Sequence, residues 1–143
     1  MRSRANRTAR DRLDVLLQHC VDLGVEVEWC NLGERQRGEY RDDRRLIVLH
    51  PVLTRRQCTA TLAHEVGHAE FGDRCSTPAV ERRAWEFGAS LVISSRDYER
   101  AEALVGPHPA ALAIELEVTP KLIEAWRRWW LKRGQRAGVR ERP

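Results

Sequence analysis

The chain has 143 residues, of which 32% are charged, and a formal net charge of +4 at neutral pH. This length gives room for one compact domain with a core that needs no disulfides. The four cysteines lie far apart without a C-x-x-C pair, which argues against a structural zinc ribbon. No apolar run could span a bilayer, and the polar, arginine-rich residues 1–12 lack the apolar stretch of a secretory signal. We therefore expect reduced thiols and a cytoplasmic location.

The charge is distributed unevenly along the chain. Five arginines and one aspartate give residues 1–12 a net charge of +4, and eight basic and two acidic residues give residues 121–143 a net charge of +6. The central part, residues 13–120, therefore carries −6. Basic ends of this kind indicate either solvated tails, the simpler interpretation, or contact with an anionic partner.

The first half of the chain is predicted to form one helix and two strands. Leucines recur at helical spacing from about Thr8 to Leu23, and Gly24 is placed to end that helix. Residues 25–29 alternate apolar and polar side chains, as a half-buried strand does. Residues 32–40 contain two glycines and are expected to form a turn and hairpin, and the apolar residues 46–50 form the second strand.

The second half is predicted to be entirely helical. Thr54 is expected to cap a helix that ends at Gly72, and Thr77 with the following proline opens the next one. Three further helices are expected over residues 97–104, 110–117 and 120–132. A helix, then strands, then only helices is the element order of a small α+β domain.

The first of these later helices carries the sequence His64-Glu65-Val66-Gly67-His68. Two histidines four residues apart lie on one helix face, so both imidazoles can bind the same metal ion. The carboxylate of Glu65 is placed to act as general base towards a zinc-activated water molecule. This pattern predicts a zinc-dependent peptidase, and its alternative is a pair of ordinary surface or core histidines.

A catalytic zinc site needs a third protein ligand and one open position. A carboxylate in the first turn of the next helix can meet the two imidazoles if that helix returns antiparallel. Spacing alone therefore favours Glu81 slightly, although the helix dipole would also favour an acid there without any metal. The candidates that the sequence leaves open are Glu70, Asp73, Cys75, Glu81 and Glu86.

Two segments together resemble the ImmA/IrrE family of metallopeptidases. These are Thr61-Leu-Ala-His-Glu-Val-Gly-His68 and Glu81-Arg-Arg-Ala84-Trp-Glu-Phe87-Gly-Ala89-Ser-Leu91-Val-Ile93, and the resemblance covers about residues 25–130. It implies that Glu81 is the third zinc ligand beside His64 and His68. The departures from the family pattern are Val66 for Leu, Gly88 for Ala and Trp85 for a frequent Asn, and none of them falls on a ligand.

The resemblance implies a small zincin-like α+β domain with a short antiparallel sheet and an active-site helix. It also implies a cytoplasmic zinc endopeptidase that cleaves a specific protein, such as a DNA-binding helix-turn-helix repressor of a phage or mobile element. An extended substrate would then pair with the strand Leu46–Leu49 as the edge strand. Tyr98 or His108 could donate a hydrogen bond to the oxyanion, but no motif places either of them. The alternative function is a DNA-binding or adaptor regulator with a structural or vestigial zinc site.

The last two predicted helices have the spacing of a helix-turn-helix. We divide the chain accordingly into a peptidase core, residues 1–106, and a helical extension, residues 107–143. DNA binding through the extension is one interpretation, and the favoured one is a helical pair that completes the core, because one short unit seldom gives specific DNA affinity. The basic residues available for DNA contacts are Lys121, Arg127, Arg128, Lys132 and Arg133.

Overall fold

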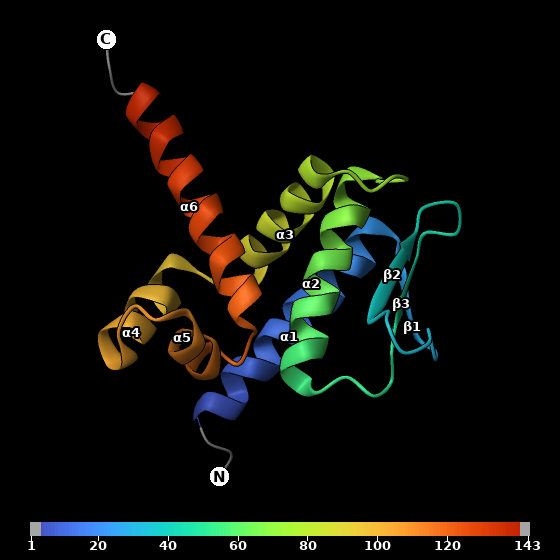
Figure 1. The fold of residues 1–143 in the computed structure, drawn as a ribbon, viewed down its shortest axis with the longest axis horizontal. Helices are drawn as coiled ribbons and strands as arrows, with labels where there is room; N and C mark the ends of the chain where they lie inside the picture. Colours follow the sequence, from blue (N-terminus) through green and yellow to red (C-terminus); the bar gives the residue numbers. More distant parts are fainter. Residues whose placement is uncertain (1–3, 141–143) are drawn as a thin grey trace.

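The computed structural model describes the backbone of residues 4–140 and the side chains of residues 12–134 (Figure 1). Within this part a helix is followed by three strands and then by helices alone, so the predicted α+β class is confirmed. Of the basic ends, predicted to be solvated tails, the side chains of residues 1–11 and 135–143 fall outside the described part. The elements are α1 (Arg4–Leu23), β1 (Glu26–Trp29), β2 (Gly38–Arg41), β3 (Leu46–Leu49), α2 (Arg55–Phe71), α3 (Pro78–Val92), α4 (Ser95–Val105), α5 (Pro109–Leu116) and α6 (Pro120–Arg140).

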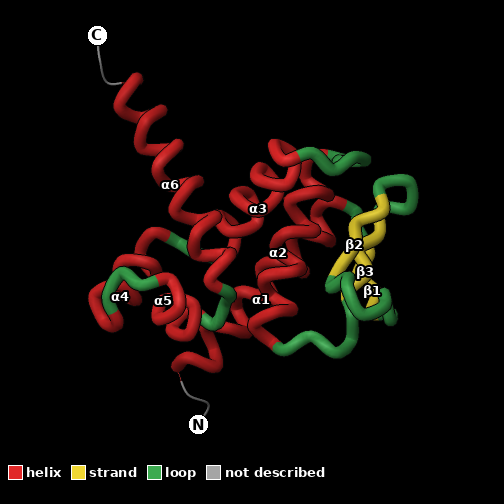
Figure 2. The backbone as a smooth tube through the Cα atoms, in the orientation of Figure 1, coloured by secondary structure: helices red, strands yellow, loops and turns green. Residues whose placement is uncertain are grey.

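The three strands form one small sheet that lies beside α2 and α1 (Figure 2). Its order is β1-β3-β2, with β1 parallel and β2 antiparallel to β3, so the sheet is mixed rather than entirely antiparallel. The prediction that Leu46–Leu49 is the edge strand is wrong, because β3 is central and all four of its residues are buried. An uninterrupted run of apolar side chains is typical of a strand that is buried on both faces of its sheet. The edge strand beside α2 is β2, where we had expected only a turn and hairpin.

Both ends of α2 are fixed by the residues that the sequence indicates. The Thr54 side chain accepts a hydrogen bond from the amide of Gln57, whose own side chain binds the Thr54 backbone, completing a capping box. At the other end Gly72 has a φ of 61°, a left-handed conformation that glycine adopts without strain. The chain therefore turns sharply after α2 and leads directly into the loop before α3.

Helices α2 and α3 pack closely through two glycines that face each other's backbones. A Cβ atom at Gly67 would lie 2.1 Å from the carbonyl oxygen of Ala84, and one at Gly88 would lie 2.1 Å from that of Ala63. No heavy atoms can approach so closely without moving the helices apart. The distance between the histidines of α2 and the first turn of α3 therefore depends on these two glycines.

We predict that Gly67→Ala destabilises the protein by about 3 kcal/mol, in the range known for overpacked cores, and also weakens metal binding. Chemical denaturation and chelator competition measure the two effects. Gly134→Ala on α6 is the matched control, because nothing lies within 4 Å of its added Cβ and alanine favours the helix. Equal stability of the two variants would contradict the packing argument.

The last two helices share the core with the rest of the molecule. Leu112 of α5 and Leu122, Ile123 and Trp126 of α6 belong to the same buried cluster as residues of α1, α2 and β3. Helix α6 is longer than predicted and extends beyond the other helices (Figure 1). These contacts support the core-completing interpretation, while the division at residue 106 stays a prediction. Among the described residues no helix is both long and apolar enough to cross a membrane.

Candidate metal centre

Three side chains from two helices converge at the mouth of a cavity beside β2. The Nε2 atom of His64 lies 3.1 Å from that of His68 and 2.9 Å from a carboxylate oxygen of Glu81, and the His68 nitrogen lies 3.3 Å from the same oxygen. One turn of α2 separates the imidazoles, and the close packing of α3 brings Glu81 to them. These three residues form a group that could hold a metal ion.

The protonation and the donor atoms of these side chains fit a metal ion that binds nitrogen and oxygen. Burial, followed by the neighbouring His68, lowers the pKa of His64 to about 4, so its imidazole is neutral and free to bind a cation at neutral pH. Two imidazoles and one carboxylate are the donor set of catalytic zinc sites with an open position. The donor chemistry of the residues present therefore fits zinc.

The other candidate ligands lie elsewhere or have another role. Asp73 approaches the opposite nitrogen of His68, with 2.9 Å between Nδ1 and the carboxylate, and Arg83 holds the second Asp73 oxygen at 2.7 Å. A carboxylate on the outer nitrogen fixes the ring orientation and tautomer of a metal-binding histidine. Glu70 pairs with His19, Glu86 faces α6, and Cys75 lies exposed in the loop that lines the cavity.

Glu65 lies between the two histidines and is almost fully buried, with 6% of its surface exposed. Its carboxylate receives a hydrogen bond from the backbone of Tyr40 on β2, yet burial dominates and raises its pKa to about 7. A carboxyl group with a pKa near neutrality is suited to accept and return a proton. The position and the electrostatics of Glu65 both fit a general base.

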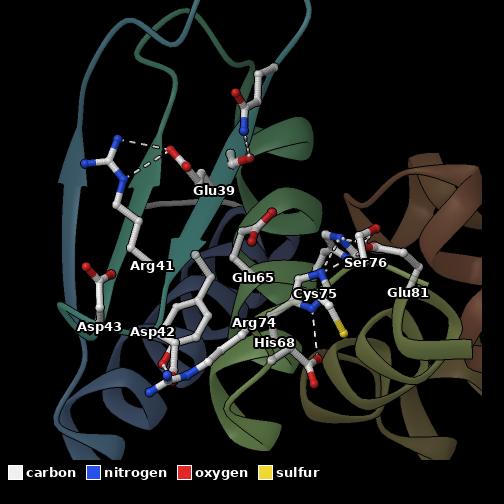
Figure 3. A pocket seen from close by; sticks show the side chains of 15 residues that line it. Glu39, Arg41, Asp42, Asp43, Glu65, His68, Arg74, Cys75, Ser76 and Glu81 are labelled. Carbon is white, nitrogen blue, oxygen red and sulfur yellow. Dashed lines mark hydrogen bonds and ion pairs between the residues drawn. The ribbon is translucent and has the colours of Figure 1, made fainter. Parts of the chain in front are cut away.

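The cavity of about 610 Å³ lies between β2 and the loop that joins α2 to α3. Figure 3 shows Glu65 and His68 reaching towards it from α2, while Glu39 and Arg41 approach from β2. The Arg74 side chain of the loop binds Asp42 at 2.7 Å, and Tyr40 donates its hydroxyl hydrogen to the same aspartate at 2.8 Å. This link connects the sheet to the loop at one end of the cavity.

Strand β2 directs to the cavity backbone groups that no other strand of the described sheet pairs. The amide of His50, just after β3, donates to the carbonyl of Arg37, just before β2. Because hydrogen bonding alternates along antiparallel strands, Gly38 and Tyr40 direct their N–H and C=O groups to the free edge. The contact between the Tyr40 backbone and Glu65 lies on that edge, so the open edge of the sheet borders the Glu65 carboxylate.

Trp85, which the sequence did not indicate as part of the site, stacks on the ring of His64 with 4.2 Å between centroids. The ammonium group of Lys121 lies over the Trp85 ring, 4.6 Å from its centre. The Nδ1 atom of His64 is buried and has no hydrogen-bond partner among the described residues, in contrast to that of His68. Stacking by Trp85 therefore restricts the orientation of the His64 ring, whereas Asp73 also engages the outer nitrogen of His68. The sequence signal for this contact is the departure from the family pattern at position 85.

We predict that Trp85→Ala lowers zinc affinity about tenfold, as loss of an outer-shell partner does, while Trp85→Phe retains most of it because the smaller ring still stacks. Competition with a chromogenic chelator measures both. Trp29→Ala, which removes an indole 53% exposed on β1, serves as control. Equal affinities for Trp85→Ala and Trp29→Ala would show that stacking does not position His64.

Tyr98 and His108, our candidates for oxyanion stabilisation, do not line the cavity. The Tyr98 ring stacks on Trp126 and its hydroxyl accepts a hydrogen bond from Arg127. The His108 side chain caps α5. Their packing and capping contacts give both residues a structural role.

A known protein family matches the part of the chain that contains this site. The family model described as Peptidase M78, IrrE N-terminal-like domain, matches residues 20–125, which include both helices of the candidate site and all three strands. No curated protein matches the chain closely enough to count as a relative. The family match covers well over half of the chain and agrees with the resemblance of its two helix motifs. The chain therefore belongs to the IrrE N-terminal-like family of peptidases.

Proposed function

We propose that the protein is a zinc-dependent endopeptidase in which His64, His68 and Glu81 hold the metal and Glu65 is the general base. One observation carries the proposal: a buried carboxylate of raised pKa lies beside a convergent two-histidine, one-carboxylate group, at an open strand edge. A structural zinc site would have no use for a titratable carboxylate, such as that of Glu65, beside its three ligands. This argues against the alternative of a regulator with a structural or vestigial site.

Each residue has a defined task in peptide hydrolysis. A bound zinc ion would lower the pKa of water and polarise the scissile carbonyl. Glu65 accepts a proton from the attacking water and later donates it to the leaving amine. Asp73 keeps the Nδ1 atom of His68 engaged, so that its Nε2 atom points to the centre.

The substrate is proposed to bind as an extended strand along β2. The Gly38 amide and the Tyr40 carbonyl on the free edge can pair with its main chain, which places a peptide bond beside Glu65. Six acidic side chains and two arginines line the cavity. Three of these carboxylates are paired with Arg41, Arg74 and Arg83, and a bound metal ion would offset Glu81, so the lining charge gives no strong preference for acidic or basic substrates.

The family resemblance supports a finer proposal about the biological substrate. We propose a specific cytoplasmic protein, such as a helix-turn-helix repressor of a phage or mobile element. DNA binding by the protein itself is the alternative. Lys121 lies over the Trp85 ring, Arg127 donates a hydrogen bond to Tyr98 and Lys132 pairs with Glu86, which favours a packing role for that helix. Absence of any gel shift with duplex DNA at low salt would remove this alternative.

The proposed activity can be tested without knowing the substrate. Zinc-loaded protein is incubated with a library of peptides derived from a bacterial proteome, and new termini are identified by mass spectrometry. We expect a small set of cleavages that disappear with a chelator and with Glu65→Gln. Cleavage that persists in Glu65→Gln would refute the mechanism.

A further inference from the structure

A second cavity, of about 570 Å³, lies between α3 and α6, away from the open edge of β2. We call it the α3–α6 groove. Three aromatic rings, from Phe71, Phe87 and Trp129, form its apolar lining. Phe71 is 42% exposed although its ring contacts Phe87 edge-on, so apolar surface remains in contact with water here. A cavity of this volume can hold several side chains of a bound segment.

The groove carries more positive charge than its own residues neutralise. Glu86, buried at its base, is paired with Lys132 at 2.7 Å, and Arg83 is paired with Asp73 at 2.7 Å. Arg82 and Arg133 also line the groove, and among the described side chains neither forms an ion pair with a carboxylate. Two guanidinium groups at an apolar cavity therefore remain available for external carboxylates, which they can bind in a bidentate manner.

The arrangement of the rings distinguishes a peptide from a nucleic acid. The guanidinium carbon of Arg83 lies 4.1 Å from the centre of the Phe71 ring, and that of Arg133 lies 5.3 Å from the centre of the Trp129 ring. These contacts cover ring faces on which nucleic-acid bases would have to stack. The groove thus fits apolar side chains flanked by carboxylates better than stacked bases.

We propose that the α3–α6 groove is a docking site for an acidic segment of a partner protein, with an aromatic or aliphatic side chain inserted between flanking Asp or Glu residues. Apolar side chains of the segment contact Phe71 and Trp129, and its carboxylates pair with Arg82 and Arg133. The site needs no metal and no cleavage. It therefore stands or falls independently of the proposed peptidase activity.

The test uses fluorescence anisotropy with the full chain carrying Glu65→Gln and a fluorescein-labelled probe peptide, Asp-Glu-Phe-Leu-Glu-Glu. We expect saturable binding that weakens with added salt. The double variant Arg82→Glu/Arg133→Glu is expected to lower affinity by about tenfold or more, because two charge-assisted pairs are replaced by repulsion. The matched control Arg96→Glu/Arg100→Glu, which makes the same charge change at exposed positions of α4, is expected to bind within about twofold of the parent.

Two further comparisons keep the proposal falsifiable. Phe71→Ser tests the apolar lining of the groove and should weaken binding of the probe peptide. A peptide with Ser-Ser in place of Phe-Leu should bind poorly to every variant. Circular dichroism and zinc stoichiometry show whether each variant is folded. The proposal is overturned if the acidic probe binds no more tightly than its Asn/Gln counterpart, if both charge variants lose binding equally, or if a labelled ten-residue oligothymidine binds more tightly than the peptide.

Discussion

Replacing Glu81 with alanine should remove most of the zinc affinity of the protein. Its carboxylate lies within 3.3 Å of both histidine Nε2 atoms, so the variant would keep two ligands where a catalytic zinc site uses three. We expect the loss of affinity to exceed the roughly 10- to 100-fold change that loss of an outer-shell partner causes. Competition with a chelator of known affinity, at fixed pH, measures the difference.

Variants of two nearby residues show how large a loss of zinc affinity is expected when no ligand is removed. Asp73→Ala removes the partner of the His68 Nδ1 atom and should fall within the outer-shell range, whereas Cys75→Ala changes an exposed loop residue and should have little effect. If Asp73→Ala or Cys75→Ala costs as much affinity as Glu81→Ala, the third ligand has been assigned wrongly.

Replacing Glu65 with glutamine should separate chemistry from metal binding. The variant retains the three ligand side chains and the size of the residue, so we expect about one zinc per chain, as in the parent. Peptide cleavage should fall by about two to four orders of magnitude, the usual contribution of a general base. Glu70→Gln is a matched control, because it makes the same change on α2 at a side chain that pairs with His19 and does not line the cavity. Equal activity losses in the two variants would contradict the assignment.

The same substitution should stabilise the metal-free protein at alkaline pH. Burial raises the pKa of Glu65 to about 7 from an ordinary value of 4.5, so the folded state holds this proton more tightly than the unfolded chain. The contribution of Glu65 to stability is therefore complete below pH 4.5 and is lost as the pH rises through about 7. We expect metal-free Glu65→Gln to exceed the parent by on the order of 3 kcal/mol at pH 8.

Urea denaturation of both proteins with a chelator present, from pH 4 to pH 8, measures this dependence. The difference in unfolding free energy should be small at pH 4 and grow across the interval between the two pKa values. A constant difference over the whole range would mean that the Glu65 carboxyl titrates normally in the folded protein.

The sequence determined the local parts of the site because their causes are local. The i, i+4 spacing of His64 and His68 places two imidazoles on one helix face wherever that helix lies. The Thr54 capping box and the left-handed Gly72 define the ends of the helix through contacts within a few residues. For Glu81, spacing left several alternatives open, and only the family pattern separated it from them.

Tertiary structure decided which strand forms the open edge beside the candidate metal centre, and which side chains contact His64 and His68. Strand order depends on pairings between residues distant in the chain, so the apolar segment Leu46–Leu49 could not reveal from its composition that it is central. Similarly, Asp73 became a partner of His68 and Trp85 of His64 only through the turn after α2 and the close approach of α3. A periodic pattern records which face of an element is buried, but the identity of its neighbour is fixed only when the whole chain packs.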